Sequence, residues 1–464
     1  MDTTAMNAST HELLRALPDG PFIAVCGRQD DADAWRDLLG ANRCLALALD
    51  NALPNATHRA VRGASQQVAR YHDLIAGLDG SGWMTEAANA FDPGRRATLV
   101  LPDPLDPPRT GDRRRLGARH PSWRLGEDKT VVDALWDSLA VPRAASIIVD
   151  GPSNLATAGA EVDLGAGVVC ACQRTGAGPT AGADGMWWWR GTDPPSALSI
   201  LQAGSYRARV MPMLDGTPVR LHGFVLDRHV VPFPPMEVVT LLRPASGTFL
   251  CTGAVPTLAD MAELATMTRH LGDGLRERLG FRGGFSVDGI LTHAGFRPTD
   301  FNARLTSAME AVPSHLRVQL HLANMLARDH RDVETGTVER LAGEIFTASS
   351  TYTLYAAASR IDENGPRAAT VQWNDRQLTL AEAGTGDGRL AVTRSPRGWL
   401  LTATLKSDRL PPGRLLGPAA PTVFALSDEV LGTDFGDLRS QVAEEHHRYL
   451  PAQRSSPDNV HPRR

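Results

Sequence analysis

The sequence lacks any apolar run near the roughly 20 residues that a membrane-spanning helix needs. Its first residues, MDTTAMNASTHELL, lack the basic region and the apolar core of a signal peptide. A strong charge bias is absent too, because 48 basic residues against 52 acidic ones leave a formal charge of −4. These absences predict a cytoplasmic protein and give no support to a nucleic-acid or membrane-surface partner.

Cysteine is also scarce. The five cysteines are an odd number and are spread along the chain, which argues against a disulfide framework and suits a reducing compartment. Cys170 and Cys172 form a C-x-C pair, but they lie in the apolar run VVCAC, and no second Cys or His pair follows at ligand spacing. We therefore interpret them as buried strand residues and not as metal ligands.

What is present is typical of a large globular chain. With 464 residues, 42% of them hydrophobic and 22% charged, the sequence predicts two or three folded domains. Near the N-terminus, apolar runs at 21–25, 45–49 and 97–101 alternate with a helical pattern around Trp35. Strand, helix and strand in this order predict a small α/β unit with a parallel sheet.

A proline- and arginine-rich stretch, 102–119, follows this unit. Its arginines could line an entrance for an anionic substrate, but a solvated linker is the interpretation that such a charge run favours. These arginines are Arg113, Arg114, Arg115 and Arg119.

Two helix starts match a capping box. Thr130-x-x-Asp133 and Thr257-x-x-Asp260 predict helices that begin near these threonines, the second ending at Gly280. Between them, 168–190 reads as two strands around a glycine-rich loop, which predicts a hairpin.

After residue 350 the pattern changes. Short β-like runs separated by Gly, Pro, Asn and Asp predict a β-rich module. The last stretch, 451–464, is expected to be a disordered tail.

The chemistry concentrates between 281 and 306, FRGGFSVDGILTHAGFRPTDFNARLT. Asp288 lies in a strand, a turn follows at Gly295, and Asp300 and Asn302 come on the returning strand. Because alternate residues of a strand share a face, this hairpin should bring two carboxylates and an amide oxygen together. Such hard oxygen ligands suit Mg²⁺ bound to nucleotide phosphates. The same spacing also fits a surface hairpin with ordinary turn residues.

Basic side chains could complete this site. Arg304 continues the alternation after Asn302 and could grip a phosphate or an acyl phosphate. Arg220 and His222 alternate along another strand, so both could face the same place. For His222, a core or rim histidine is favoured over a catalytic base.

This segment resembles the strand pair of ATP-grasp ligases, in which an acidic residue is followed by a Glu-x-Asn-x-Arg signature. Asp300 stands where most members have Glu. The resemblance implies an ATP-grasp fold of the α/β class and the use of ATP and Mg²⁺. It also implies that Asp288, Asp300 and Asn302 are metal ligands and that Arg304 and Arg220 are catalytic.

Two further segments are similar to that family in the same order. GEDKTVVDALWDSLAVPRA resembles its Asp-Lys helix and implies that Lys129 contacts the nucleotide; a solvent-exposed first-turn lysine is the alternative. MPMLDGTPVRLHGFVLD resembles its interdomain strand and implies adenine contacts by Met213, Leu214 and Asp215.

The glycine-rich loop departs from the family in one respect. Many members have a Lys in the strand before this loop, whereas here the position is Gln173, which carries no charge. Gly176, Gly178 and Gly182 could let backbone N–H groups approach phosphates, although a flexible hairpin turn would look the same.

The whole arrangement most resembles the pheganomycin-type peptide ligases. It implies a pre-ATP-grasp α/β domain at 1–120, a central subdomain at 121–205, a large subdomain at 206–346, a β-rich module at 347–450 and the tail. The implied function is ATP-dependent joining of a small acid to an amino-acid or peptide amine in natural-product biosynthesis, with a homodimer as an open expectation. A degenerate ATP-grasp scaffold and an ATP-dependent phosphotransferase are the alternatives.

Overall fold

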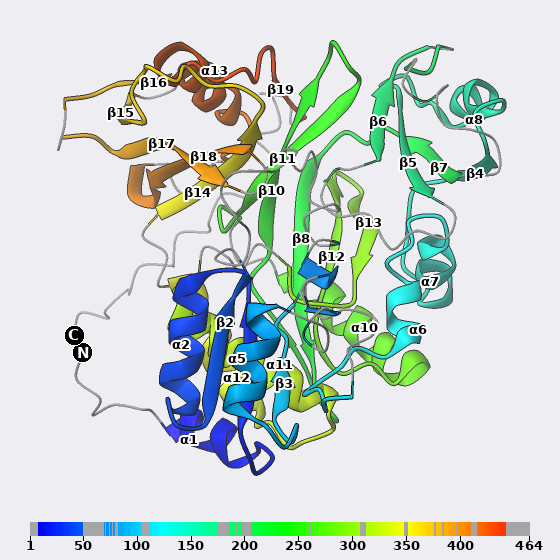
Figure 1. The fold of residues 1–464 in the computed structure, drawn as a ribbon. Coiled ribbons are helices and arrows are strands. Elements are labelled where there is room, and N and C mark those ends of the chain that lie inside the picture. Colours follow the sequence, from blue (N-terminus) through cyan, green and yellow to red (C-terminus); the bar gives the residue numbers. More distant parts are fainter. Residues whose placement is uncertain are drawn as a thin grey trace, which may run out of the picture.

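The computed structural model describes residues 8–49, 82–103, 112–174, 185–191, 206–258, 262–306, 312–347, 351–374, 377–382, 385–395, 398–409 and 415–441, together with 69, 71–73, 75, 76, 78, 183, 193–195 and 198. Three β-sheets and the helices packed on them make up this part of the chain (Figure 1). The mixed α/β class predicted from the sequence is confirmed.

The first sheet is the predicted N-terminal α/β unit. Its strands are parallel in the order β2-β1-β3. Successive β1 side chains enter different cores: Phe22 packs with Trp35 of α2, and Ile23 packs with the cluster that holds Met84 of α5. The elements are α1 (Ala8–Arg15), β1 (Phe22–Cys26), α2 (Gln29–Leu39), β2 (Cys44–Ala48), α5 (Trp83–Phe91) and β3 (Thr98–Val100).

The second sheet has 11 strands and spans both of the expected central and large subdomains. Its main path runs β13-β12-β8-β10-β11-β6-β5-β7-β4, and β9 and β19 pair with β8 and β10. The predicted hairpin at 168–190 is confirmed by antiparallel pairing of β5 with β6. The strands are β4 (Ile147–Asp150), β5 (Val168–Arg174), β6 (Met186–Trp189), β7 (Tyr206–Pro212), β8 (Thr217–Val225), β9 (Val230–Pro232), β10 (Met236–Arg243), β11 (Thr248–Val255), β12 (Gly283–Thr292), β13 (Gly295–Asn302) and β19 (Arg439–Ser440).

Helices cover both faces of this sheet. Leu221 and Val287 pack in one cluster with Leu271 of α10, whereas Phe224 packs in another with Leu320 of α11. Along β8 and β12, one set of alternate side chains therefore faces α10 and the other set faces α11. The helices are α6 (Pro121–Leu125), α7 (Val132–Ser138), α8 (Leu155–Val162), α10 (Ala262–Leu279), α11 (Ser314–Arg328) and α12 (Thr335–Thr347).

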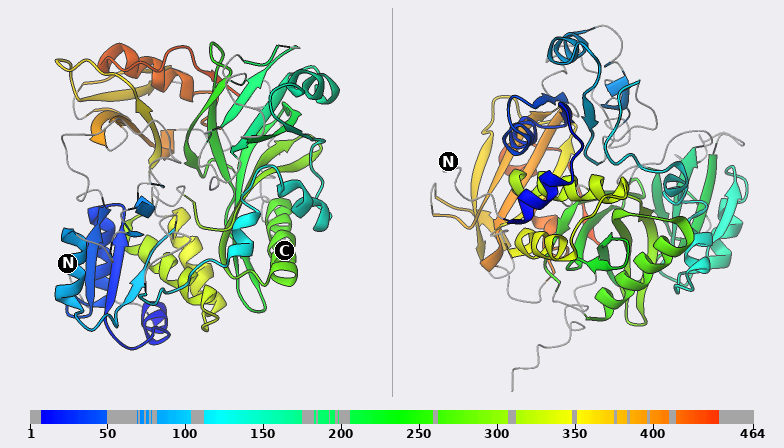
Figure 2. Two further views of the ribbon diagram at one scale, coloured as in Figure 1. Left: turned by 45° about the vertical axis from the view of Figure 1, so that its right-hand side comes forward. Right: turned by 90° about the horizontal axis from the view of Figure 1, so that it is seen from below.

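The third sheet is the predicted β-rich C-terminal module. Its antiparallel strands lie in the order β14-β18-β17-β15-β16, and the module packs on β10 and β11 of the large sheet, above the N-terminal unit in the view of Figure 1 (see also Figure 2). Buried Glu237 of β10 helps hold it, accepting hydrogen bonds from the backbone N–H groups of Leu416 (2.7 Å) and Gly417 (2.6 Å). The elements are β14 (Thr351–Ala358), β15 (Ala368–Asn374), β16 (Gln377–Leu380), β17 (Gly388–Ser395), β18 (Gly398–Lys406), a 3-10 turn (Ser407–Arg409) and α13 (Ala420–Leu431).

The first predicted capping box is wrong, because its acidic residue is used elsewhere. Helix α7 begins at Val132, without a side-chain cap. Thr130 donates from its backbone N (2.8 Å) and its hydroxyl (2.7 Å) to Asp128, while Asp133 pairs with the buried Arg209.

The second predicted box, Thr257-x-x-Asp260, stays a prediction. Thr257 donates its hydroxyl to Glu237, and residue 260 lies outside the described residues. Helix α10 does end at Gly280, as predicted, where the backbone takes φ 58°.

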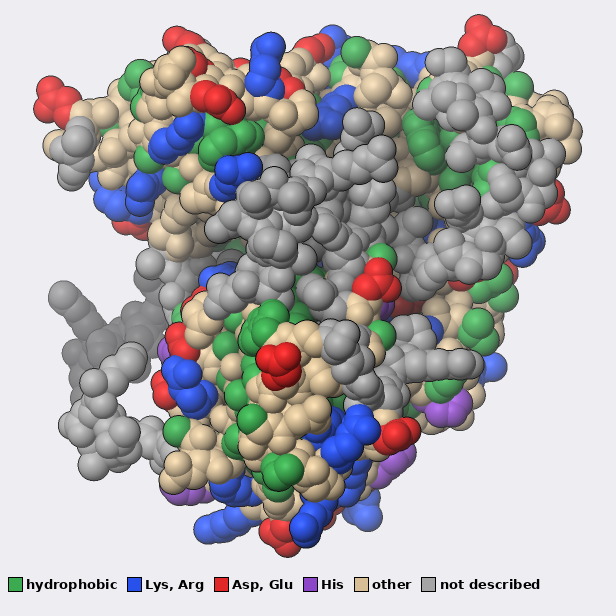
Figure 3. Space-filling view, in the orientation of Figure 1, with side chains coloured by type: hydrophobic (Ala, Val, Ile, Leu, Met, Phe, Trp, Pro, Cys, Tyr) green, Lys and Arg blue, Asp and Glu red, His purple; other side chains and the backbone are tan. Residues whose placement is uncertain are grey.

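The outer surface agrees with the near-neutral net charge. On the face shown in Figure 3, Lys and Arg side chains lie among Asp and Glu over the described parts. None of the described helices is long and apolar enough to cross a membrane. The tail expected at 451–464 falls outside the described residues.

Candidate functional site

The predicted hairpin between Asp288 and Asn302 is confirmed and forms the edge of the large sheet. Strands β12 and β13 pair with Asp288 opposite Asp300 and with Ser286 opposite Asn302. Directly opposed residues share a face, with Cβ atoms about 5 Å apart. The two carboxylates and the amide therefore lie on one side of the hairpin, as the spacing predicts.

Strand β8 extends this arrangement on the other side of β12. Arg220 lies opposite Asp288, and His222 lies opposite Ser286. Three adjacent strands thus present two rows of polar side chains on one face. The first row is Arg220, Asp288 and Asp300, and the second is His222, Ser286 and Asn302.

Arg220 and Asp288 form a bidentate ion pair. Arg220 Nε lies 2.5 Å from Asp288 Oδ1, and Nη2 lies 2.8 Å from Oδ2. Burial opposes ionisation of Asp288, but the Arg220 charge outweighs it and leaves the pKa of Asp288 lowered. The carboxylate is consequently anionic at neutral pH and able to serve as a metal ligand.

His222 is a buried neutral side chain. Its Nε2 lies 2.9 Å from Thr306 Oγ1, a hydroxyl that Arg220 Nη1 also reaches at 3.2 Å. Burial first, and Arg220 second, lower the pKa of His222 to about 3. A histidine so hard to protonate is a poor proton acceptor, which supports the core interpretation favoured from the sequence.

Asp300 is paired with Lys129. The Lys129 Nζ lies 2.8 Å from Asp300 Oδ2, and Lys129 is only 4% exposed. The alternative of a solvent-exposed first-turn lysine is therefore wrong. Lys129 and Lys406 are the two lysines among 48 basic residues, so a compact ammonium at this position stands out in an arginine-rich chain.

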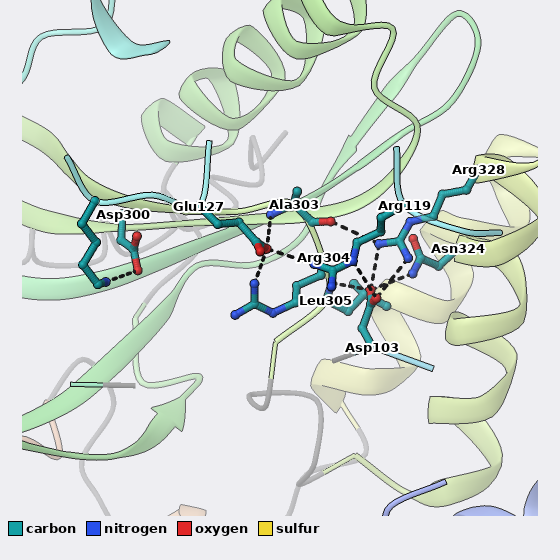
Figure 4. Close-up of polar contacts among 10 residues, drawn as sticks. Asp103, Arg119, Glu127, Asp300, Ala303, Arg304, Leu305, Asn324 and Arg328 are labelled. Carbon is teal, nitrogen blue, oxygen red and sulfur yellow. Dashed lines mark hydrogen bonds and ion pairs between the residues drawn. The ribbon is translucent and has the colours of Figure 1, made fainter. Parts of the chain in front are cut away.

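Strand β13 ends at Asn302, so Arg304 does not continue its face as the alternation predicts. Arg304 Nη1 instead donates to Glu127 Oε1. The same oxygen accepts Arg119 Nη1 (3.1 Å) and the backbone N–H of Ala303 (3.1 Å). Figure 4 shows these contacts and, to their side, Asp300.

Behind Glu127 lies a second buried carboxylate, Asp103, at the carboxyl end of β3. It accepts Arg328 Nη1 (3.0 Å) and Nη2 (2.8 Å), Asn324 Nδ2 (3.0 Å) and the backbone N–H of Leu305 (3.0 Å). Burial opposes its ionisation, but Arg328 and Arg119 lower its pKa strongly. These contacts join the N-terminal unit to the end of the hairpin (Figure 4).

Sequence reasoning missed both carboxylates. Glu127 stands beside the Asp-Lys pair, and Asp103 follows a predicted strand, where functional side chains often lie, so both signals were present. The prediction of a solvated linker at 102–119 is wrong for two of the arginines in that stretch. Arg119 is buried with Glu127, and Arg113 is buried with Asp92.

The expected adenine-binding residues lie farther along the sheet. Buried Gln173 lies opposite Arg207 at one end of the β5–β7 pair, while Met213 follows the other end, where Val168 meets Pro212. Five residues of strand separate these ends, about 17 Å. The structure therefore does not bring Gln173 beside Met213, Leu214 and Asp215, and Gly176, Gly178 and Gly182 lie outside the described residues.

The donor set near Asp288 fits a hard divalent cation. Within the described part of the chain, no group of three or more His, Cys, Asp or Glu side chains is arranged to hold a metal. Asp288, Asp300 and Asn302 supply two carboxylates and an amide oxygen, to which phosphates and water would add. Ser286 Oγ and His222 Nδ1 are buried in the adjoining row without a described hydrogen-bond partner, so polar capacity remains there.

Comparisons with known proteins found no match to a family model and none to a curated protein. Solved structures do resemble the fold. The chain is 12% identical to phosphoribosylamine–glycine ligase from Thermotoga maritima, with a TM-score of 0.43 over 91% of this chain and 100% of that one. It is 11% identical to N5-carboxyaminoimidazole synthase from Aspergillus clavatus in complex with ADP and 5-aminoimidazole ribonucleotide, with a TM-score of 0.45 over 85% and 97%. It is 12% identical to N5-carboxyaminoimidazole ribonucleotide synthetase from Thermus thermophilus, with a TM-score of 0.43 over 92% and 98%. At these scores the function has to be argued from the site itself.

Proposed function

We propose that this chain is an ATP-dependent ligase of the ATP-grasp type, which activates a carboxylate as an acyl phosphate and joins it to an amine. One observation carries the proposal. Two carboxylates on adjacent strands, Asp288 and Asp300, lie between two cations, Arg220 on the next strand and Lys129 before α7. Asn302 lies two residues beyond Asp300 on the same face. Such a site suits a metal-bound polyphosphate, because the carboxylates can bind the metal ion while the cationic side chains bind the phosphates.

The residues divide into two sets. Asp288, Asp300 and Asn302 would hold Mg²⁺, which when bound neutralises charge on the β- and γ-phosphates. Lys129 and Arg220 form ion pairs with Asp300 and Asp288 in this structure, and they would contact phosphate oxygens if Mg²⁺ were bound by those carboxylates.

The reaction needs positioning and charge stabilisation more than a protein nucleophile. The substrate carboxylate attacks the γ-phosphorus, ADP leaves, and the amine then attacks the acyl carbon and displaces phosphate with loss of a proton. Arg304 and Arg220 would stabilise the negative charge that develops on the transferred phosphoryl group and the acyl oxygen. The neutral His222 supports this set through Thr306 and does not act as the base.

The finer assignment rests on the sequence resemblance. We propose a peptide ligase similar to the pheganomycin type, with an amino-acid-like or guanidino-acid donor and an amino-acid or peptide acceptor. The proposed domain bounds, the phosphate contact by Lys129, the nucleotide contacts by Gln173 and by 213–215, the cytoplasmic location and the homodimer belong to the same resemblance.

A second candidate is an ATP-binding protein that no longer ligates. It is favoured by the pairing of both candidate metal ligands with cations of the chain itself and by the uncharged Gln173 at the family's lysine position. This candidate predicts nucleotide binding without turnover.

The test is ADP release with Mg²⁺, ATP and pools of amino acids, guanidino acids and peptides. We expect release to require both an acid and an amine, and mass spectrometry to find a product equal to their sum less water. Asp300→Ala should abolish turnover, because the metal loses a ligand. It should also lower the melting temperature, because the buried Lys129 loses its carboxylate, so activity is measured where circular dichroism shows the variant folded.

The matched control is Asp227→Asn, an exposed aspartate that pairs with Arg282. It should keep full activity. Normal turnover in Asp300→Ala would refute the metal assignment, and nucleotide binding without ADP release from any pool would favour the non-ligating candidate.

A further inference from the structure

Glu127, which sequence reasoning missed, contacts the residues that follow the hairpin directly. Its side chain is 3% exposed, and one oxygen, Oε1, accepts Arg304 Nη1, Arg119 Nη1 and the N–H of Ala303. Three donors on one buried oxygen leave it little freedom to move. The position of Arg304 is therefore coupled to that of Glu127.

The segment that carries Glu127 lies along the end of β13. Gly126 is so close to Phe301 that a Cβ at 126 would lie 2.7 Å from the ring. Lys129, two residues after Glu127, pairs with Asp300. Three successive contacts thus fix this segment against the stretch that bears Asp300, Asn302 and Arg304.

The charge of Glu127 is retained although it is buried. Burial opposes ionisation, but Arg304 and Arg119 outweigh it, and the pKa of Glu127 is lowered. Arg304 donates from one nitrogen to this carboxylate, and its guanidinium makes no other hydrogen bond or ion pair that is seen among the described residues. In the view of Figure 4, the rest of the guanidinium extends toward the side on which Asp300 lies.

We propose that Glu127 is a positioning residue, which holds the Arg304 guanidinium where the γ-phosphate of bound ATP, and then the acyl phosphate, would lie. The inference rests on the proposed function, since it supplies the phosphate that Arg304 meets. Glu127 itself touches neither metal nor substrate. Asp103 acts one layer farther out by holding Arg328 beside Arg119.

The test compares binding of the imido analogue of ATP with binding of ADP, by calorimetry in Mg²⁺. The ratio of the two dissociation constants reports contacts to the γ-phosphate and is unaffected by a uniform loss of folded protein. Wild type should prefer the triphosphate. Glu127→Gln keeps the shape and one acceptor oxygen but loses the charge, and it should reduce the preference about three- to tenfold.

Two further variants sharpen the result. Asp128→Asn changes the neighbouring carboxylate, which binds only Thr130 among the described contacts, and should leave the preference unchanged. Arg304→Gln should reduce the preference for the triphosphate at least as much as Glu127→Gln. The double variant should reduce it no further than Arg304→Gln, because Glu127 acts through Arg304.

Two outcomes would overturn only the positioning role of Glu127. The first is that the two changes have additive effects on the ratio of dissociation constants. The second is that this ratio is unchanged in Glu127→Gln but reduced in Arg304→Gln. An unchanged ratio in Arg304→Gln would overturn the Arg304 assignment in the proposed function as well. If Glu127→Gln melts early, Glu127→Asp replaces it, because a carboxylate one methylene shorter keeps the charge but cannot hold Arg304 in place.

Discussion

At the scale of single residues, Gly126 shows how tightly the segment before Lys129 packs against the hairpin. Gly126 has no side chain where the segment crosses Phe301, and an added Cβ would meet the ring at 2.7 Å. The glycine is thus required by close approach and not by a special backbone angle. The neighbouring Glu127 and Lys129 depend on that approach for their contacts with Arg304 and Asp300.

We predict that Gly126→Ala lowers the free energy of unfolding by about 1–3 kcal/mol, because overpacking forces the ring or the segment to move. Urea denaturation measures it. Gly336→Ala is the control, since a Cβ there meets nothing within 4 Å and the residue lies in α12. The control should be neutral or slightly stabilising, and equal losses in both variants would contradict the clash.

At the scale of elements, α7 is oriented by a buried ion pair. Asp133 binds Arg209 of β7 (2.6 Å), and Arg209 Nη1 donates to the carbonyl of Thr299 in β13 (2.7 Å). The Arg209 side chain is only 1% exposed. One guanidinium therefore connects a helix and two strands of the large sheet.

Asp133→Ala should destabilise the protein by about 3–5 kcal/mol, because it leaves a buried guanidinium without its carboxylate. Thermal melting and urea denaturation would measure the loss. Asp137→Ala on the same helix removes a 59% exposed partner of Arg143 and should have a much smaller effect, because water screens this pair. A small effect in Asp133→Ala would show that Arg209 is neutralised by another group.

At the scale of the whole molecule, α11 lies between the N-terminal unit and the large sheet and carries a buried histidine. Burial is the main cause that lowers the pKa of His321 to about 4, and Arg317 and Arg328 add to it. The unfolded chain binds a proton at this residue below about pH 6.5, whereas the folded chain does not. Stability should consequently fall as the pH falls from 6.5 toward 4.

His321→Gln should reduce the loss of stability between about pH 6.5 and 5 by about 2 kcal/mol, since one proton-binding difference is worth about 1.4 kcal/mol per pH unit. Urea denaturation at several pH values would measure the slope. His222 contributes in the same direction, while Glu237, whose pKa is raised by burial, contributes in the opposite one. The difference between variant and wild type therefore carries the test, and parallel curves would contradict it.

Local sequence determined the hairpin and its polar row. A strand alternates its side chains, so the spacing from Asp288 to Asp300 and Asn302 is enough to place all three on one face once a turn is recognised at Gly295. The N-terminal α/β unit, the helix that ends at Gly280 and the β-rich module followed from apolar periodicity and turn residues for the same reason: each is specified by neighbours in sequence.

Only the tertiary structure decided which partners these side chains meet. The Thr130 cap does not form, because Asp133 pairs with the distant Arg209. Thr257 donates its hydroxyl to Glu237, which also accepts from the backbone of the distant Leu416 and Gly417. Glu127 and Asp103 became part of the site only when segments 176 and 202 positions apart came together at Ala303 and Leu305. No spacing in a sequence records such contacts, because they depend on how whole elements pack.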